Sequence, residues 1–394
     1  MSEKINFNTI LNHNGNTIKG VDKGVPKVAP IVMSAAYSFS HPQDLFASLK
    51  HEIPDYDYGR EGNATNDCAN EILCALDGGA VAQVYATGMA SICMTVMAQI
   101  KAGDHIILSS IVFGGTFNLI VNKLMKRYGV EVTVVDLNDP DWEKNFKPNT
   151  KMVYMETISN PMIEVLDMQK IADVTHAHNA VLVVDNTFAT PIVCRPLSLG
   201  ADFVVYSGTK YMNGHSDIMA GVVVGKDEKI MKDIISEGHV FGPTMSPFDA
   251  FLFARGLRTL ELRMRQHSSN AMKLAEYLSK HPKVKEVRYP GLASNPYHEV
   301  AKKQFNGIYG GMVSIDLGTF ENVISCMEYF KFIKLVPSLG CLTTTYSDTR
   351  TSHGGMSAED RAKCGIGDSI MRVSVGLEDI DDIIAEFERG FAKL

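Results

Sequence analysis

The sequence predicts an α/β fold in which a large, parallel-rich sheet domain is followed by a smaller C-terminal α/β domain. Residues 180–184 and 202–206 are unbroken apolar runs, and such runs are typical of strands covered on both faces in parallel sheets. These strands alternate with helical patterns, which implies right-handed crossovers between parallel neighbours. At 394 residues the chain exceeds a single hydrophobic core, so two domains, or one domain with a large extension, are expected.

Taken in order, the elements divide the chain into three parts. Residues 1–55 lack periodicity, so we expect an extended N-terminal arm that packs on a partner subunit. Prolines interrupt this arm at Pro26, Pro30, Pro42 and Pro54. We expect the larger domain over residues 56–250 and the smaller over 251–394, with a long helical pattern from 246 to 278 at the boundary. Further strands are expected at residues 84–86, 102–108, 129–135, 152–156, 220–224, 285–289, 311–317 and 370–375, and helices at 88–100, 167–178, 227–236, 320–331 and 379–392.

Composition and failed motifs exclude several classes of protein. The net charge is −7 and no basic run occurs, which argues against a nucleic-acid partner. No stretch approaches the ~20 apolar residues of a membrane helix, and a signal peptide is not expected. Seven scattered cysteines without a Cys-x-x-Cys pattern fit reduced thiols, so a cytoplasmic location is expected. Residues 221–227 fall short of a P-loop, 365–370 of a dinucleotide fingerprint and 298–302 of a zinc-protease helix, and no metal site is expected.

Two chemically active side chains follow the two buried strands. Lys210 comes shortly after the run 202–206, with Ser207 and Thr209 beside it, and Asp185 directly follows 180–184. Open α/β sheets bind ligands at the carboxyl ends of their strands. Pyridoxal phosphate requires a lysine for a Schiff base and an acid that keeps its ring nitrogen protonated. A structural ion pair between Asp185 and Lys210, or a solvated loop lysine, is the competing interpretation.

Residues 184–191 and 207–217 resemble the Cys/Met-metabolism family of pyridoxal-phosphate enzymes, and the likeness extends from about residue 25 to the C-terminus. That family contains cystathionine γ-synthase, cystathionine β- and γ-lyases, methionine γ-lyase and the O-acylhomoserine sulfhydrylases. The resemblance implies PLP fold type I, which is aspartate-aminotransferase-like. It also implies pyridoxal 5'-phosphate as cofactor, an amino-acid substrate and a homotetramer built from two active dimers.

The resemblance assigns roles that the residues alone leave open. Lys210 is expected to bond the cofactor and then to move protons, and Asp185 to stabilise the ring nitrogen. The phosphate is expected on Ser207, Thr209, the Gly88 and Met89 amides, and Tyr58 and Arg60 of the partner subunit. Phe113 is expected to stack on the ring, Asn160 to bond its phenolic oxygen, and Arg372 and Ser338 to bind the substrate α-carboxylate. By spacing alone, an exposed turn at Tyr58–Arg60 and a structural salt bridge at Arg372 are favoured. A plain helix cap at Gly88 and an Asn-Pro turn at Asn160 then serve equally well.

Three departures from the family pattern bear on the reaction. Phe113 stands where most members have tyrosine, Gly115 where methionine γ-lyases have cysteine, and residues 341–348 are atypical. Without the tyrosine hydroxyl, Tyr58 is the remaining candidate acid at the γ position. An ester leaving group needs little protonation, so the sequence favours γ-replacement on an O-acylhomoserine, giving homocysteine. The alternatives are a cystathionine or methionine γ-lyase that releases a 2-oxoacid, ammonia and a thiol, and a cofactor-free binding protein, against which the intact Lys210 and Asp185 argue.

Overall fold

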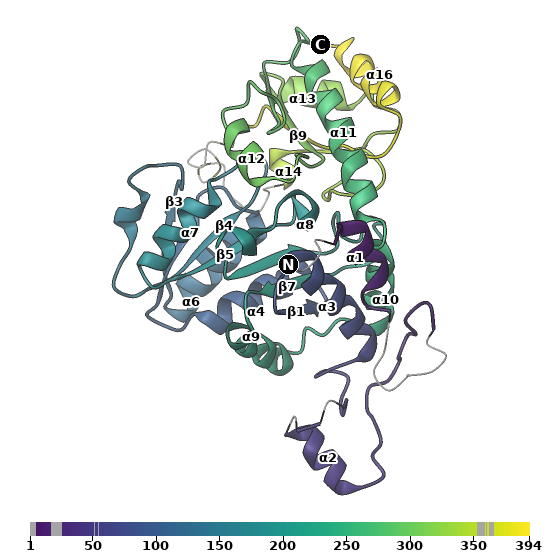
Figure 1. Ribbon diagram of the computed structural model, residues 1–394. Coiled ribbons are helices and arrows are strands. Elements are labelled where there is room, and N and C mark those ends of the chain that lie inside the picture. Colours follow the sequence, from purple (N-terminus) through teal and green to yellow (C-terminus); the bar gives the residue numbers. More distant parts are fainter. Residues whose placement is uncertain are drawn as a thin grey trace.

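Two sheets, each with a hydrophobic core of its own, organise the chain (Figure 1). The computed structural model describes residues 5–16, 26–50, 52–53, 55–352, 359, 361 and 366–394. The expected α/β architecture, with a larger and a smaller sheet, is confirmed. Pro54 and Cys364 lie outside the described residues.

The larger sheet has seven strands in the order β1-β7-β6-β5-β4-β2-β3. Its strands are β1 (Val81–Tyr85), β2 (His105–Ser109), β3 (Glu131–Val135), β4 (Thr150–Glu156), β5 (Val181–Asp185), β6 (Phe203–Ser207) and β7 (Gly221–Gly225). Pairings among β2 to β6 are parallel, whereas β7 runs antiparallel to both β1 and β6. The segment between β6 and β7 contains no helix, so the chain returns antiparallel rather than crossing over.

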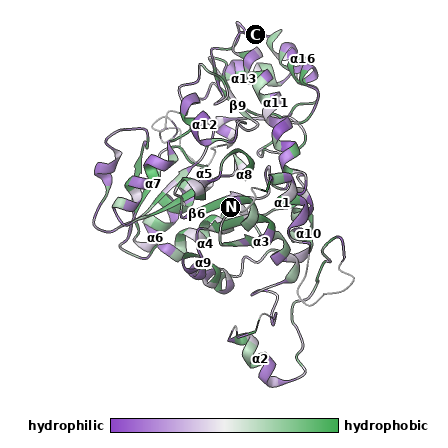
Figure 2. Cartoon of the chain, viewed as in Figure 1, coloured by the Kyte–Doolittle hydropathy of each residue, from purple (hydrophilic) through white to green (hydrophobic). Residues whose placement is uncertain are grey.

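Helices cover both faces of this sheet, as the apolar runs predicted. Leu182 and Val184 face one core and Val183 faces the other, because successive side chains of a strand alternate. Figure 2 shows the strands of the large sheet as predominantly hydrophobic. The helical elements of this part are α3 (Ala64–Asp77), α4 (Gly88–Gln99), α5 (Gly114–Phe117), the π-helix η1 (Asn118–Met125), α6 (Lys126–Tyr128), the 3-10 turns η2 (Trp142–Asn145) and η3 (Pro196–Leu199), α7 (Met168–Ala177), α8 (Thr190–Val193), α9 (Glu228–Phe241) and α10 (Pro247–Leu257).

The smaller sheet has five strands in the order β10-β11-β12-β9-β8. They are β8 (Glu286–Arg288), β9 (Met312–Asp316), β10 (Lys334–Leu335), β11 (Thr345–Asp348) and β12 (Ile370–Ser374), accompanied by α11 (Leu260–Leu278), α12 (His298–Gln304), α13 (Phe320–Met327), α14 (Thr349–Ser352) and α16 (Ile380–Phe391). Along α11, Leu260 and Met264 pack in the core of the large sheet, while Ala271 and Leu274 pack in that of the small one. This helix therefore joins the two parts of the molecule.

The N-terminal segment differs from the extended arm that the sequence predicts. It contains α1 (Phe7–His13) and α2 (Pro42–Leu49), and α2 projects away from the large sheet (Figure 1). Leu11 of α1 is buried in the core of its own subunit. The Arg258 guanidinium binds the C-terminal carbonyls of α1, with 2.7 Å from Nη1 to the Asn14 oxygen. A cation at this end of a helix satisfies free carbonyls. Arg258 itself lies between α10 and α11, where the helix predicted over residues 246–278 is interrupted.

Candidate active site

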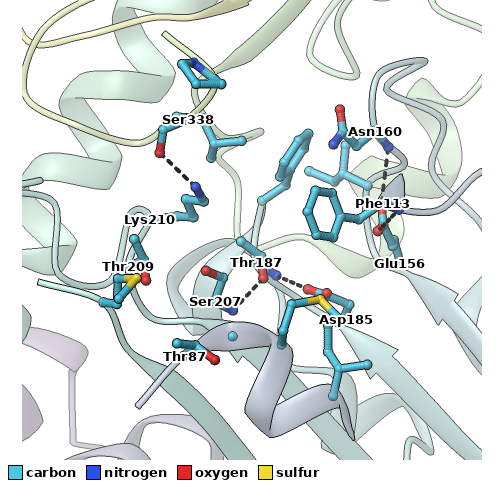
Figure 3. A pocket seen from close by; sticks show the side chains of 18 of the residues that line it. Thr87, Phe113, Glu156, Asn160, Asp185, Thr187, Ser207, Thr209, Lys210 and Ser338 are labelled. Atoms are coloured by element: carbon cyan, nitrogen blue, oxygen red, sulfur yellow. Dashed lines mark hydrogen bonds between the residues drawn. The ribbon is translucent and has the colours of Figure 1, made fainter. Parts of the chain in front are cut away.

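A cavity of about 420 Å³ lies at the carboxyl edge of the large sheet and is closed by residues of the smaller part (Figure 3). Lys210 and Asp185 reach it from the loops and ends of β6 and β5. Ser338 and Arg372 reach it from the segment before β11 and from β12. The site thus forms where the sheet edge predicted from the sequence meets the second sheet.

Lys210 is held with its amine inside the cavity. Its Nζ donates a hydrogen bond of 2.7 Å to the Ser338 hydroxyl. Burial, followed by repulsion from the Arg372 guanidinium, lowers the pKa of Lys210 to about 8. A lysine with this pKa has a substantial neutral fraction near pH 7, and the neutral amine is the nucleophile and base.

Asp185 lies beside a second carboxylic acid that sequence reasoning missed. Glu156 ends β4 as Asp185 ends β5, and the two residues are in register on neighbouring parallel strands. The Thr187 backbone N–H donates to Asp185 Oδ1 at 3.0 Å. Burial raises the pKa of Asp185, although its hydrogen bonds with Thr187 lower it, and burial together with the nearby Asp185 carboxylate raises the pKa of Glu156. The sequence contained a signal for Glu156, because this acid ends the predicted strand 152–156 just as Asp185 ends its own strand.

A cradle for an anion is formed where α4 begins. Thr87 caps this helix by accepting a hydrogen bond of 3.1 Å from the Ala90 N–H. A Cβ on Gly88 would come within 2.7 Å of the Ser207 Cβ, so only glycine allows the helix start to touch the end of β6. Ser207, Thr209 and Met89 also line the cavity. Free N–H groups at a helix start, with hydroxyls alongside, favour a phosphate.

Phe113 forms an aromatic wall of the cavity (Figure 3). Its side chain is 41% exposed, so that part of the ring is accessible to a ligand in the cavity. A side chain at residue 115 would require the Phe113 ring to move from its present position. A Cβ on Gly115 would lie 2.5 Å from Phe113 Cε1 and 2.9 Å from Met89 Sδ. Phe113 and Gly115 therefore form a sterically matched pair.

Arg372 supplies a buried positive charge opposite the sheet edge. Its Nη1 donates to Asn160 Oδ1 at 2.7 Å, and Nη2 lies 3.5 Å from the Ser338 carbonyl oxygen. Burial lowers the pKa of Arg372 to about 10. Within the described part of the chain, no carboxylate oxygen forms a salt bridge with it, so the alternative of a structural salt bridge has no support there. A guanidinium held by neutral acceptors retains capacity for an anionic partner.

Tyr58 and Arg60 lie away from this cavity within the single chain. The Arg60 guanidinium stacks over the Tyr58 ring at 5.5 Å and forms an ion pair of 3.0 Å with Glu61. It also donates to the His239 carbonyl oxygen. Ten of the twelve site residues predicted from the sequence line the cavity, and these two do not. That Tyr58 and Arg60 bind the cofactor phosphate in the cavity of a neighbouring subunit remains a prediction.

The residues present fit pyridoxal phosphate. The cavity offers an amine of lowered pKa, a buried acid, an aromatic face and a helix start that only glycine permits. When bound, the cofactor supplies an electron-withdrawing ring that stabilises negative charge at the substrate Cα. Among the described residues, no cluster of three or more His, Cys, Asp or Glu is placed to hold a metal ion.

The comparison with known proteins agrees with this fit. The family described as "Cys/Met metabolism PLP-dependent enzyme" matches residues 8–392. The chain belongs to this family. It is therefore a PLP-dependent enzyme, and the alternative of a cofactor-free binding protein loses its support.

Relatives within the family carry several activities. The chain is 42% identical to the O-succinylhomoserine sulfhydrylase of Pseudomonas aeruginosa, over 92% of this chain and 90% of the relative. It is 40% identical to the L-methionine gamma-lyase of Porphyromonas gingivalis, over 93% and 92%. A solved Campylobacter jejuni structure that contains N'-pyridoxyl-lysine-5'-monophosphate matches with a TM-score of 0.93 and 29% identity, over 98% and 100%. The family is thus established, while these identities do not separate its reactions.

Two further observations concern the described residues as a whole. None of their helices has both the length and the apolar character needed to cross a membrane. The described cysteines form no disulfide bond.

Proposed function

We propose that the enzyme is an O-acylhomoserine sulfhydrylase. A sulfur nucleophile replaces the acyloxy group at Cγ, so that a C–S bond forms, the C–O bond breaks, and homocysteine and a carboxylate are released. The observation that carries this proposal is the exposed Phe113 ring in the cavity wall. A phenylalanine offers no proton, and a carboxylate leaving group needs none, whereas a thiolate gains from a nearby acid.

The remaining site residues have roles consistent with this reaction. Lys210 Nζ takes the proton from the substrate Cα and returns protons at neighbouring atoms, for which a pKa of about 8 is suitable. Arg372 binds the substrate α-carboxylate, exchanging its weak contact with the Ser338 carbonyl for a charged one. Asp185 provides a negative charge for the cofactor's ring nitrogen. Asn160 holds Arg372 in place through its side-chain oxygen, which accepts from Nη1 at 2.7 Å.

The phosphate cradle is proposed to be completed by a second subunit. Tyr58 and Arg60 are exposed and lie away from the cavity of their own chain. In the proposed homotetramer, two chains pair so that the partner's Tyr58 and the partner's Arg60 reach this cavity. The projecting segment around α2 and its exposed Phe46 and Leu49 support such an interface.

A cystathionine or methionine γ-lyase is the second candidate. The 40% identity to a methionine gamma-lyase favours it, and the partner's Tyr58 would supply the proton that Phe113 lacks. A steady-state comparison of O-acetylhomoserine and O-succinylhomoserine, each with sulfide, against cystathionine and methionine tests the choice. The proposal requires a higher kcat/KM for one of the esters; a higher value for cystathionine or methionine would make the enzyme a lyase.

A further inference from the structure

Glu156 forms two hydrogen bonds that link separate walls of the cavity (Figure 3). Its Oε1 accepts the Phe113 backbone N–H at 2.7 Å, and its Oε2 accepts the Asn160 backbone N–H at 3.2 Å. Phe113 follows β2 and Asn160 follows β4, which are adjacent strands. One side chain therefore holds the two loops that leave the sheet at this edge.

Both loops carry groups that face a ligand. The Phe113 loop presents the exposed ring, and Asn160 uses its side-chain oxygen to hold Arg372. We propose that Glu156 is a positioning residue for the cofactor and the substrate, acting through the Phe113 ring and the Asn160–Arg372 pair. This rests on the family's cofactor and is independent of which member reaction the enzyme performs.

The chemistry of the two bonds explains why a carboxylate is required. Each oxygen faces an N–H donor, and both oxygens of a carboxyl group have lone pairs that accept a hydrogen bond. A glutamine of the same shape has one accepting oxygen and one NH₂ group. Whichever way the amide is oriented, one backbone N–H meets another donor and that loop loses its anchor.

The chain keeps a carboxyl group at residue 156 although its surroundings oppose ionisation. Glu156 is 7% exposed and lies beside Asp185, so that burial and like charge both disfavour ionisation. The two backbone N–H groups and the charge of Arg372 act in the opposite direction. A residue that served only to fill space here would be apolar at lower cost.

Glu386 provides a matched control within the same chain. It is also a buried glutamate, and its Oε2 accepts the backbone N–H groups of Lys331 at 2.5 Å and Phe332 at 2.9 Å, while its Oε1 forms an ion pair with Arg389. It lies on α16 in the core of the smaller sheet and does not line the cavity. Replacing it tests the loss of a buried carboxylate clamp without altering the site.

The experiment compares Glu156→Gln, Glu156→Asp and Glu386→Gln with the wild type. The affinity for pyridoxal phosphate is measured by equilibrium dialysis, the ring environment by the circular dichroism of the bound cofactor, and KM, kcat and thermal stability separately. For Glu156→Gln we expect cofactor affinity to fall tenfold or more, the dichroism to change and KM to rise. Glu156→Asp keeps the carboxyl group but has a shorter side chain that reaches one loop and not both. Its cofactor affinity should therefore lie between those of Glu156→Gln and the wild type. Glu386→Gln should lower the melting temperature and leave cofactor affinity, dichroism and KM unchanged.

Two results would overturn the proposal. One is a Glu156→Gln enzyme that loses stability as Glu386→Gln does, while its cofactor affinity, dichroism and KM remain those of the wild type. The other is a Glu156→Gln chain that does not fold, because Glu156 would then be a structural residue. A change of substrate preference would affect only the proposed function, since cofactor affinity is measured without substrate.

Discussion

Asp185 and Asp77 are both buried next to the large sheet, and burial raises the pKa of each, but only Asp185 lies in the cavity. Burial raises the pKa of Asp185 and raises that of Asp77 to about 7. Asp77 ends α3 and accepts a hydrogen bond of 2.6 Å from the Tyr206 hydroxyl. Asp77 is 2% exposed and does not line the cavity, whereas Asp185 lines it together with Lys210 and Glu156. A raised pKa therefore does not identify a functional acid, and convergence of several groups on one cavity does.

Removing the cavity's amine should produce the largest effect. Lys210→Ala should retain its fold and lose about 10²–10⁴-fold or more in turnover, since the nucleophile and proton carrier are gone. Steady-state kinetics measure the loss. Borohydride reduction of the wild type followed by peptide mapping identifies the bonded lysine, and label on any other lysine would contradict the assignment.

Replacing each aspartate by asparagine should lower kcat strongly for Asp185 and hardly at all for Asp77. Asp185→Asn removes a charge that the cofactor's ring nitrogen requires, and should reduce kcat by about tenfold to a hundredfold, the worth of one charged hydrogen bond. Asp77→Asn keeps an acceptor for Tyr206 and should leave kcat within about twofold. Equal losses of activity in the two variants would break the distinction between the cavity acid and the core acid.

A hydroxyl introduced at the cavity wall should alter the choice of substrate. Phe113→Tyr should raise elimination from cystathionine or methionine relative to turnover of an O-acylhomoserine, because a well-placed general acid contributes ~100-fold or more. A several-fold change in the ratio of kcat/KM values is expected for partial alignment. The double variant Tyr58→Phe/Phe113→Tyr shows whether the partner's Tyr58 already provides the proton. An unchanged ratio in both variants would remove Phe113 as the basis of the proposed reaction.

Mixing two inactive variants tests whether a second chain completes the cavity. Arg60→Ala and Lys210→Ala subunits should each be inactive alone and regain part of the activity after exchange. In a hybrid dimer, one cavity then receives an intact Lys210 and the partner's Arg60. Native mass spectrometry confirms the exchange, and no recovery after exchange would place each site within one chain.

Asp77→Asn should have the smallest effect on activity, but it should change how the free energy of unfolding depends on pH. The folded pKa of Asp77 is about 7 and exceeds the ordinary aspartate value, so the folded state holds a proton that the unfolded state has released. The stabilising contribution is complete below the unfolded pKa and is lost as pH rises to about 7. Between pH ~4 and ~7 the wild type should therefore lose unfolding free energy relative to Asp77→Asn, by up to ~1.4 kcal/mol per pH unit. Denaturant titrations across this range check the slope, and parallel curves would assign Asp77 an ordinary pKa.

Local sequence patterns were sufficient for the sheet edge and its two central residues. The strands ending at Asp185 and Ser207 are apolar throughout, and an unbroken apolar run needs no distant information to be recognised. The places of Lys210 and Asp185 follow from strand ends, because parallel strands bring their carboxyl ends to one edge. Short polar strands such as β11 carry no comparable signal, and their pairing depends on neighbours that the local pattern does not reveal.

Contacts between distant segments determined the rest. Glu156 binds the backbone of Phe113 from 43 positions away, and Arg372 binds Asn160 from 212 positions away. A hydrogen bond of this kind depends on which strands become neighbours, and no periodicity within either segment encodes it. The same holds for Arg258, which ends one helix and binds another 244 positions earlier in the chain. The apolar pattern along the chain thus determined which edge of the large sheet carries the site. The hydrogen-bond partners that orient each side chain were determined by the packing of the two sheets, because a buried polar group bonds to whichever donor or acceptor the fold brings next to it.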